Sequence, residues 1–338
     1  MRSDWKEALL YEKLEKGRLR CNLCAHRCVI SDGKFGVCKV RANEDNKLYT
    51  LVYGRAISQH VDPVEKKPLY HFYPGSSAYS IATPGCNFRC QWCQNWEIAH
   101  MPRERGVIAG RKVSPEEVVA DARATHSRSI AYTYTEPTIF FEYAYDIAQL
   151  AHEASIANIY VTNGYMTPEM LETIYPNLDA ANVDLKAFRE KTYHRYVGAA
   201  LQPVLESMKL MKSQGVWLEV TTLLVPDLND DPQELRDAAL FIAQELGPDT
   251  PWHISRFFPQ YKMNDRPPTP VASLQRAQQI GLEAGLHFVY MGNVGSEADT
   301  VCPNCGYTVI RRSGYWDIRN RLKDGNCPNC GTAIAGVW

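Results

Sequence analysis

Seven short apolar segments alternate with helical segments between residues 77 and 292, and this alternation is the strongest constraint on the fold. The strand candidates cover residues 78–83, 129–135, 158–163, 181–188, 217–225, 252–257 and 287–292. Repeated strand–helix units predict a parallel sheet with right-handed crossovers. They suit an open or closed α/β barrel, with a doubly wound open sheet as the alternative. In both architectures, functional residues are expected at the carboxyl ends of the strands.

The segments between the strands carry helix-start signals. The clearest is SPEEVVADARATH, where Ser114 is the expected cap, Pro115 the first helical residue and Glu117 the third position of an S-x-x-E capping box. Further helices are expected within residues 138–154, 167–175, 201–215, 231–247 and 270–285. The first 20 residues mix charged and apolar side chains and read as an amphipathic helix without the apolar core of a signal peptide.

The 11 cysteines fall into three clusters, and none is left over. The clusters are Cys21, Cys24, Cys28 and Cys38; Cys86, Cys90 and Cys93; and Cys302, Cys305, Cys327 and Cys330. Disulfides are typical of small secreted proteins, and this chain of 338 residues is neither small nor visibly secreted. Clustered short spacings in such a chain predict metal binding at all three places.

The middle cluster, in ATPGCNFRCQWCQNWEI, has three cysteines rather than four. A [4Fe–4S] cluster is normally held by four cysteines, so three would leave one iron free for another ligand. Pro84 and Gly85 are expected to turn the chain, and Trp92 to cover the site. The alternative is a zinc or [2Fe–2S] site completed by a distant ligand such as His100.

The C-x3-C-x2-C spacing with an aromatic residue before the last cysteine resembles the signature of the radical S-adenosylmethionine (SAM) superfamily. Within it, the chain resembles the branch of pyruvate formate-lyase activating enzymes. The segments CNLCAHRCVI, GVCKVRAN, DPVEKKPLYHFYPGS and ATPGCNFRCQWCQNWEI resemble the AmmeMemoRadiSam family. The resemblance implies an α/β fold with three parts: an N-terminal four-cysteine unit and connector (1–72), a partial (β/α)6 barrel (73–298), and a C-terminal module similar to rubredoxin or a zinc ribbon (299–338).

The resemblance also implies an activity. An oxygen-sensitive [4Fe–4S] cluster on Cys86, Cys90 and Cys93 would bind SAM and cleave it reductively to a 5′-deoxyadenosyl radical, which abstracts hydrogen from a substrate. Such an oxidoreductase needs a low-potential electron donor of the flavodoxin or ferredoxin type. The substrate is not identified, and a protein is among the candidates.

Four cofactor-binding residues follow from the same resemblance. Glu136 in YTYTEPT is expected to hold the methionyl amino group, and Asn163 lies in the matching VTNGY segment. Asp184 and Lys186 belong to an Asp-Leu-Lys triplet and share one face of a strand, with Lys186 facing the methionyl carboxylate. The alternatives are a surface or capping role for Glu136 and a structural ion pair for Asp184 and Lys186.

Two positions depart from the pattern of the activating enzymes. Val161 stands where an aspartate that helps to bind a monovalent cation is expected, and Tyr261 stands where a substrate-facing histidine is expected. Both departures weaken a direct transfer of the glycyl-radical-activating function.

The two outer clusters predict four-ligand metal sites. The doubled CPNCG of Cys302, Cys305, Cys327 and Cys330 favours zinc over iron, because structural zinc sites commonly have this spacing. Cys21, Cys24, Cys28 and Cys38 suit zinc, which is slightly favoured, or a second [4Fe–4S] cluster. The basic residues near the C-terminus are expected to form a solvated face, and they are Arg311, Arg312, Arg319, Arg321 and Lys323.

Composition narrows the function classes. The net charge of −1 gives no reason to expect a nucleic-acid partner, and no apolar run is long enough to span a membrane, so a cytoplasmic location is expected. The first hypothesis is therefore a radical SAM enzyme, with an activase that installs a glycyl radical on a partner enzyme as its variant. A hypothesis of another class is a metal-stabilised scaffold that binds protein or RNA.

Overall fold

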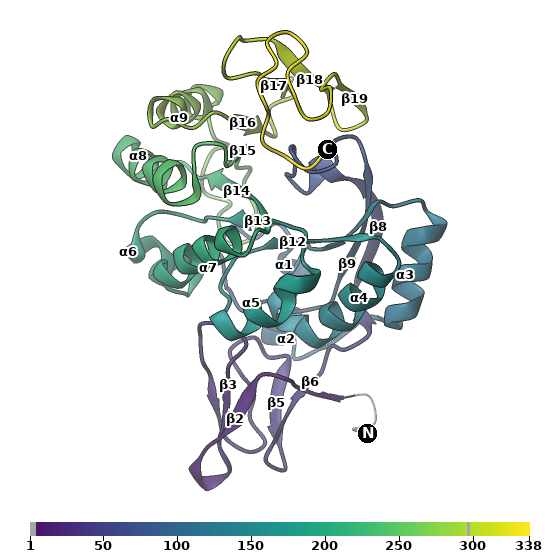
Figure 1. Cartoon of the computed structure of the whole chain (residues 1–338). Helices are drawn as coiled ribbons and strands as arrows, with labels where there is room; N and C mark the ends of the chain where they lie inside the picture. Colours follow the sequence, from purple (N-terminus) through teal and green to yellow (C-terminus); the bar gives the residue numbers. More distant parts are fainter. Residues whose placement is uncertain (1–4, 296–297) are drawn as a thin grey trace.

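The computed structural model describes residues 5–295 and 298–338, and an eight-stranded sheet forms its centre (Figure 1). The strand order is β16-β15-β14-β13-β12-β11-β9-β8, in which β8 is antiparallel to β9 and all other neighbours are parallel. The strands are β8 (Ser58–Pro63), β9 (Ser77–Ala82), β11 (Ser129–Tyr132), β12 (Ala157–Thr162), β13 (Ala180–Asp184), β14 (Trp217–Leu224), β15 (Trp252–Arg256) and β16 (Val289–Gly292). Within the described ranges, no pairing joins β8 to β16, so the sheet is open.

The seven strands expected from the sequence form the parallel part of this sheet. Parallel strands covered on both faces are almost continuously apolar, and all four residues of β11 are buried. The last expected strand joins the sheet as β16. The edge strand β8 lies before residue 72, in the part of the chain that the sequence analysis assigned to the connector, yet it pairs with β9 of the central sheet. The domain boundary at residue 72 stays a prediction.

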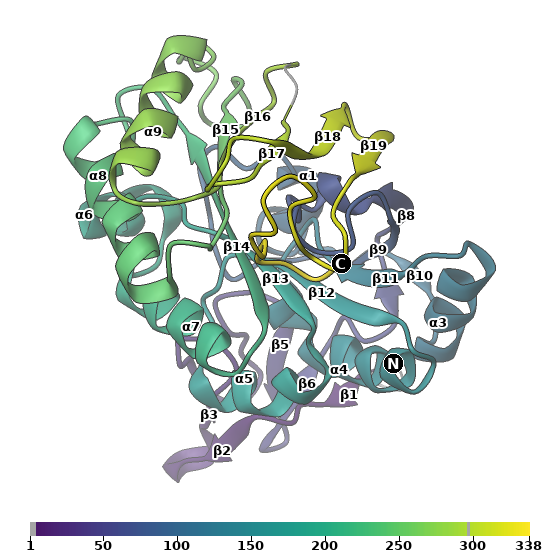
Figure 2. The same cartoon turned by 45° about the horizontal axis from the view of Figure 1, so that its top comes forward.

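The longer helices pack outside the sheet, and Figure 2 shows several of them along its rim. They are α3 (Pro115–Ala124), α4 (Phe141–Glu153), α5 (Pro168–Ile174), α7 (Gln202–Ser213), α8 (Pro232–Phe241) and α9 (Val271–Glu283). The capping box expected at α3 is present: Glu117 N donates to Ser114 Oγ over 3.2 Å, and Ser114 N donates to the Glu117 carboxylate over 2.7 Å. No helix in the described part of the chain is both long and apolar enough to cross a membrane.

Short elements connect these units. They are β7 (Arg55–Ala56), α1 (Trp96–Ala99), α2 (Met101–Glu104), β10 (Arg111–Lys112) and α6 (Glu190–Thr192). β7 and β10 pair antiparallel beside the main sheet.

The N-terminal unit consists of two small antiparallel sheets at the end of the molecule drawn in purple (Figure 1). Their strands are β1 (Lys6–Glu7), β2 (Tyr11–Lys13), β3 (Leu19–Cys21), β4 (Val29–Ile30), β5 (Arg41–Glu44) and β6 (Lys47–Thr50). The helix expected over the first 20 residues is therefore wrong for residues 5–20, and residues 1–4 lie outside the described ranges. Lys16 and Gly17 adopt positive φ values of 60° and 67°, which turn β2 back onto β3.

The C-terminal unit is a three-stranded antiparallel sheet, β17 (Thr300–Val301), β18 (Thr308–Ser313) and β19 (Asp317–Asn320). It shares an apolar core with Phe288 and Tyr290 next to and within β16. Arg312, expected on a solvated face, is only 1% exposed. Its guanidinium donates to the carbonyl of Tyr70 over 2.5 Å and to Thr300 Oγ1 over 2.7 Å, so this arginine anchors the unit instead of facing solvent.

One buried carboxylate joins the connector, the sheet and the C-terminal unit. Glu219 on β14 accepts hydrogen bonds from the backbone N–H groups of Tyr70 and His71, at 3.0 and 2.8 Å. It also bonds Trp217 Nε1 at 3.0 Å and His253 Nε2 at 2.6 Å. Burial alone would raise the pKa of Glu219, but the bonds from His253 and the connector hold it below its usual value.

His71 extends this junction to the C-terminus. Its Nε2 bonds Tyr290 Oη at 2.6 Å, and its Nδ1 bonds the carbonyl of Ala335 at 2.7 Å. The backbone of Val337 then pairs with residues 71 and 73. The tail of the chain is therefore held against the same buried cluster that Glu219 organises.

We expect Glu219→Leu to lower the free energy of unfolding by at least about 3 kcal/mol, because several buried donors would each lose a partner at about 1–3 kcal/mol. Urea unfolding of the metal-loaded protein measures the change. Glu206→Leu is the control, since this exposed residue on α7 has only surface partners and a change within about 0.5 kcal/mol is expected. Equal losses in the two variants would contradict the central role of Glu219.

The same junction predicts a pH dependence. Because the pKa of Glu219 is lowered by folding, its contribution is complete above the ordinary glutamate pKa of about 4.3 and is lost as the pH falls below it. The stability difference between the wild-type protein and Glu219→Leu should therefore shrink in acid. A difference that stays constant down to the acid transition would argue against a charged Glu219.

Candidate active site

A cavity of about 570 Å³ opens at the carboxyl ends of the parallel strands. Its wall contains Cys86, Cys90 and Cys93 from the loop after β9. Thr162 and Asn163 follow from the end of β12, and the ends of β13, β14 and β15 supply Asp184, Lys186, Thr221, His253 and Ser255. Tyr70 from the connector and Tyr315 from the C-terminal unit also line it. Polar side chains therefore gather at the carboxyl edge of the sheet, where the sequence predicts the functional residues.

The cysteine loop takes its shape from a close backbone contact. Gly85 has a φ of +112°, and a Cβ atom there would lie 2.8 Å from Val40 Cγ1 of the N-terminal unit. Only glycine fits this conformation and this approach. Directly after it, the Phe88 N–H points to Cys86 Sγ at 3.3 Å, as backbone donors do around thiolate ligands.

Burial raises the pKa of all three cavity thiols. Burial raises the pKa of Cys90 to about 12 and raises that of Cys86 well above its usual value. The positive charge of Lys186 acts in the opposite direction on Cys90 and Cys93. Because metal ligands are thiolates, loading of this site must release protons and would be favoured by the nearby lysine.

Asp184 and Lys186 form an ion pair on the cavity wall. Lys186 Nζ lies 2.7 Å from Asp184 Oδ2, and the Lys186 N–H donates to Tyr193 Oη over 3.1 Å. Burial would lower the pKa of Lys186, but the charge of Asp184 and the hydrogen bond to it raise the pKa overall, so the ammonium stays charged. The pair therefore offers one cationic and one anionic group to the cavity.

Glu136 lies behind the wall rather than in it. It is 0% exposed, and its carboxylate accepts from Thr162 Oγ1 at 2.7 Å, from the Asn163 N–H at 2.8 Å and from both donors of Thr138. Burial raises the pKa of Glu136. Asn163, which does line the cavity, donates to Asn87 Oδ1 over 2.7 Å within the cysteine loop. Glu136 thus positions Asn163, and Asn163 in turn steadies the loop.

The two positions that depart from the activating-enzyme pattern lie in different places. Val161 lines the cavity. Tyr261 instead stacks on Trp96 and His100, with ring centroids 5.2 Å apart in both pairs, and its hydroxyl bonds Glu104. His100, the alternative fourth ligand, belongs to this stack and is absent from the described cavity wall.

Sequence reasoning missed Glu219, Thr221 and Ser255. Thr221 pairs with Asp184 and with His253 in the sheet register. Because functional residues of parallel sheets lie at the carboxyl ends of the strands, inspecting the end of each predicted strand would have found this row of side chains. Glu219 gave no comparable signal, because a single acidic residue in an apolar strand does not reveal its partners from the connector.

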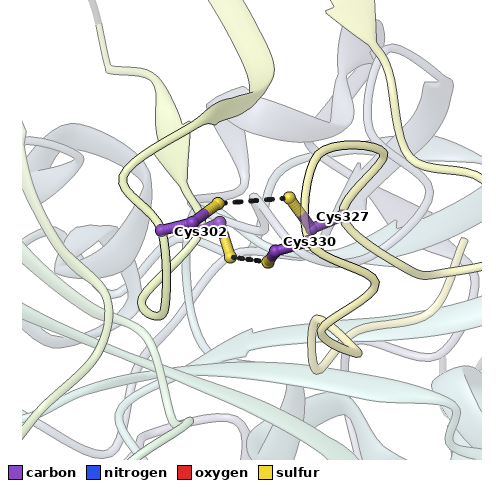
Figure 3. A group of neighbouring side chains, drawn as sticks. Cys302, Cys327 and Cys330 are labelled. Carbon is purple, nitrogen blue, oxygen red and sulfur yellow. Dashed lines mark hydrogen bonds between the residues drawn. The ribbon is translucent and has the colours of Figure 1, made fainter.

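The three cysteine clusters differ in how closely their sulfur atoms approach. Cys302, Cys305, Cys327 and Cys330 have all four Sγ atoms within 4.8 Å of one another, and Figure 3 shows the labelled side chains pointing toward a common centre. Among the described residues, no three thiols of the other two clusters meet this distance. Zn–S bonds of 2.3 Å place tetrahedral thiolates about 3.8 Å apart, so the C-terminal set suits a single metal ion. A [4Fe–4S] cluster binds each cysteine to a different iron and therefore needs wider spacing than a single ion.

The cavity also contains buried polar atoms that call for a ligand. Trp92 Nε1 and Thr221 Oγ1 line it and have no hydrogen-bond partner among the described residues. Buried donors are normally satisfied, so these two fit a polar molecule bound beside the cysteines. Three thiols, an ammonium and unpaired donors together fit an iron–sulfur cluster with a charged cofactor.

Comparisons with known proteins agree with this geometry. The family model of the radical SAM superfamily matches residues 80–239. A Methanocaldococcus jannaschii protein, named "Uncharacterized protein MJ0808", is 44% identical over 333 residues, which cover 97% of this chain and 98% of the relative. The pyruvate formate-lyase-activating enzyme of Clostridium pasteurianum is 24% identical over 47% of this chain and 66% of its own length.

A likeness in fold extends to a solved structure. Streptococcus suis SuiB bound to S-adenosylmethionine aligns with a TM-score of 0.51 and 12% identity, over 68% of this chain and 53% of SuiB. With the cysteine loop placed at the carboxyl edge of a parallel sheet, these matches lead to one conclusion: the chain belongs to the radical SAM superfamily.

Proposed function

We propose that this protein cleaves SAM reductively at a [4Fe–4S] cluster held by Cys86, Cys90 and Cys93, and uses the 5′-deoxyadenosyl radical to abstract hydrogen from a substrate. One observation carries the proposal: three thiols, without a fourth among the described lining residues, share a cavity of about 570 Å³ with an Asp–Lys pair. When bound, the cluster and SAM supply the one-electron chemistry.

The residues of the chain bind and orient the cofactor. Lys186 is suited to the methionyl carboxylate and Asp184 to the methionyl ammonium, because both are charged groups on the wall. Asn163 holds the cysteine loop through Asn87, and Glu136 holds Asn163 from behind. Glu136 is thereby proposed as a positioning residue in place of the direct contact that the resemblance implied.

The proposed activity has two variants, which differ in the substrate. Similarity to the Clostridium pasteurianum activating enzyme supports the variant in which the target is a glycine of a partner enzyme. Tyr261, stacked on Trp96 away from the cavity wall, does not supply the group expected to face such a substrate. We therefore favour hydrogen abstraction from another organic or protein substrate, in line with the proposed AmmeMemoRadiSam membership.

We expect the anaerobically loaded protein to form 5′-deoxyadenosine from SAM when reduced with dithionite. Mass spectrometry of the nucleoside measures the product. A variant with Cys86, Cys90 and Cys93 changed to alanine should form none, because it lacks all three ligands. A loaded wild-type protein that forms no nucleoside would contradict the enzyme and favour the metal-stabilised scaffold.

We expect Lys186→Met to weaken SAM binding by about 10- to 100-fold, because a hydrogen bond to a charged group contributes about 1.5–3 kcal/mol. Anaerobic calorimetry measures the affinity, and iron content shows whether the cluster is retained. Lys209→Met on the surface of α7 is the matched control. Unchanged affinity in Lys186→Met would assign its ion pair with Asp184 a structural role only.

A further inference from the structure

The N-terminal cysteines form a second site beside the first. Cys21, Cys24, Cys28 and Cys38 all line one small, largely apolar pocket. As noted above, no three of their sulfur atoms lie within 4.8 Å of one another, in contrast to the C-terminal set. Four thiols around one pocket can hold zinc or a [4Fe–4S] cluster, so the other groups of the pocket decide between them.

Unpaired donors of a buried arginine in the same pocket point to an occupant that accepts hydrogen bonds. Arg41 lines the pocket and is 2% exposed. Its Nη2 pairs with the buried carboxylate of Glu142, while its Nε and Nη1 have no partner within the described part of the chain. Two unpaired buried donors are costly unless a ligand accepts from them. Sulfur atoms of a cluster bound by four thiolates are such acceptors, and hydrogen bonds to them are a known means of tuning its potential.

The pocket is in direct contact with the cysteine loop of the active site. Val40, two residues after Cys38, makes the close approach to Gly85 described above. Ile139 lines the N-terminal pocket and lies 3.5 Å from the position of a Cβ atom at Gly85. A single layer of side chains therefore separates the pocket from the residue that precedes Cys86.

Hydrogen bonds reinforce this contact. His26, between Cys24 and Cys28, places its Nε2 2.9 Å from the carbonyl oxygen of Asn87. Arg103 donates to the carbonyls of Val37 and Cys86, at 3.2 and 3.4 Å. The residues flanking both sets of cysteines are thus bonded to one another.

From these observations we propose that Cys21, Cys24, Cys28 and Cys38 bind a second [4Fe–4S] cluster that passes electrons to the cluster at Cys86, Cys90 and Cys93. This role rests on the proposed function. A reductant of the flavodoxin or ferredoxin class gives one electron to the N-terminal cluster. This electron then moves to the cluster at Cys86, Cys90 and Cys93, and the N-terminal cluster is oxidised again. No covalent bond changes in this transfer. Cys28 is partly exposed and Val37 is 43% exposed, so this side of the pocket is open to a reductant.

The first test asks what the N-terminal site contains. The variant with Cys86, Cys90 and Cys93 changed to alanine keeps the N-terminal unit intact. After anaerobic loading it should retain about four iron and four sulfide ions per chain and give the electron paramagnetic resonance signal of a reduced cluster. Further replacement of Cys24 and Cys28 by alanine should remove the iron, the sulfide and the signal. Zinc without sulfide in the first variant would overturn the proposal, whatever the outcome of the SAM assay.

The second test asks whether the N-terminal cluster passes electrons to the active site. SAM cleavage by the wild-type protein and by Cys28→Ala is measured with dithionite, a small reductant, and with reduced flavodoxin. The ratio of flavodoxin-driven to dithionite-driven rates should fall in Cys28→Ala, and a ratio that stays the same would overturn the relay. A wild-type protein inactive with both reductants would contradict the proposed function instead, while the iron and sulfide content of the first test still decides the cluster.

Discussion

The buried carboxylate of Glu219 is the constraint on which the arrangement of the molecule depends. A charge in the centre of a sheet is stable only with several donors, and the donors here come from the connector, β14 and β15. Through His71 the same cluster reaches Tyr290 and the C-terminal tail. Satisfying one charge therefore brings Tyr70 and the C-terminal unit to the mouth of the cavity.

The active-site loop obeys a second constraint, which is close approach. Gly85 and Val40 bring the loop of Cys86 against the N-terminal unit, while Asn163 bonds the loop from the sheet side. The protein's own contacts therefore hold the loop between two supports. Such preorganisation suits a site in which a charged cofactor must meet a cluster and exclude water.

Much of the fold was predictable because its signals are local. The strands from β9 to β16 and the capping box of α3 follow from apolar runs and a four-residue motif. The helix predicted over the first 20 residues was wrong because mixed charged and apolar residues fit a helix or a strand equally well. Positive φ values at Lys16 and Gly17 instead turn the chain between two strands. The solvated position predicted for Arg312 was wrong because a basic residue in a basic stretch gives no sign of its buried partner, the Tyr70 carbonyl of the connector.

Spacing and periodicity are properties of neighbouring residues, so the sequence alone indicated the three cysteine sets and the edge of the sheet where functional residues are expected, while the resemblance of the cysteine motif indicated the superfamily. The positions of Glu136 behind Asn163, of Glu219 between three parts of the chain, and of the four C-terminal thiols around one centre emerged from the folded structure. Those outcomes depend on distances between residues far apart in the chain, which burial and packing set and no local pattern encodes.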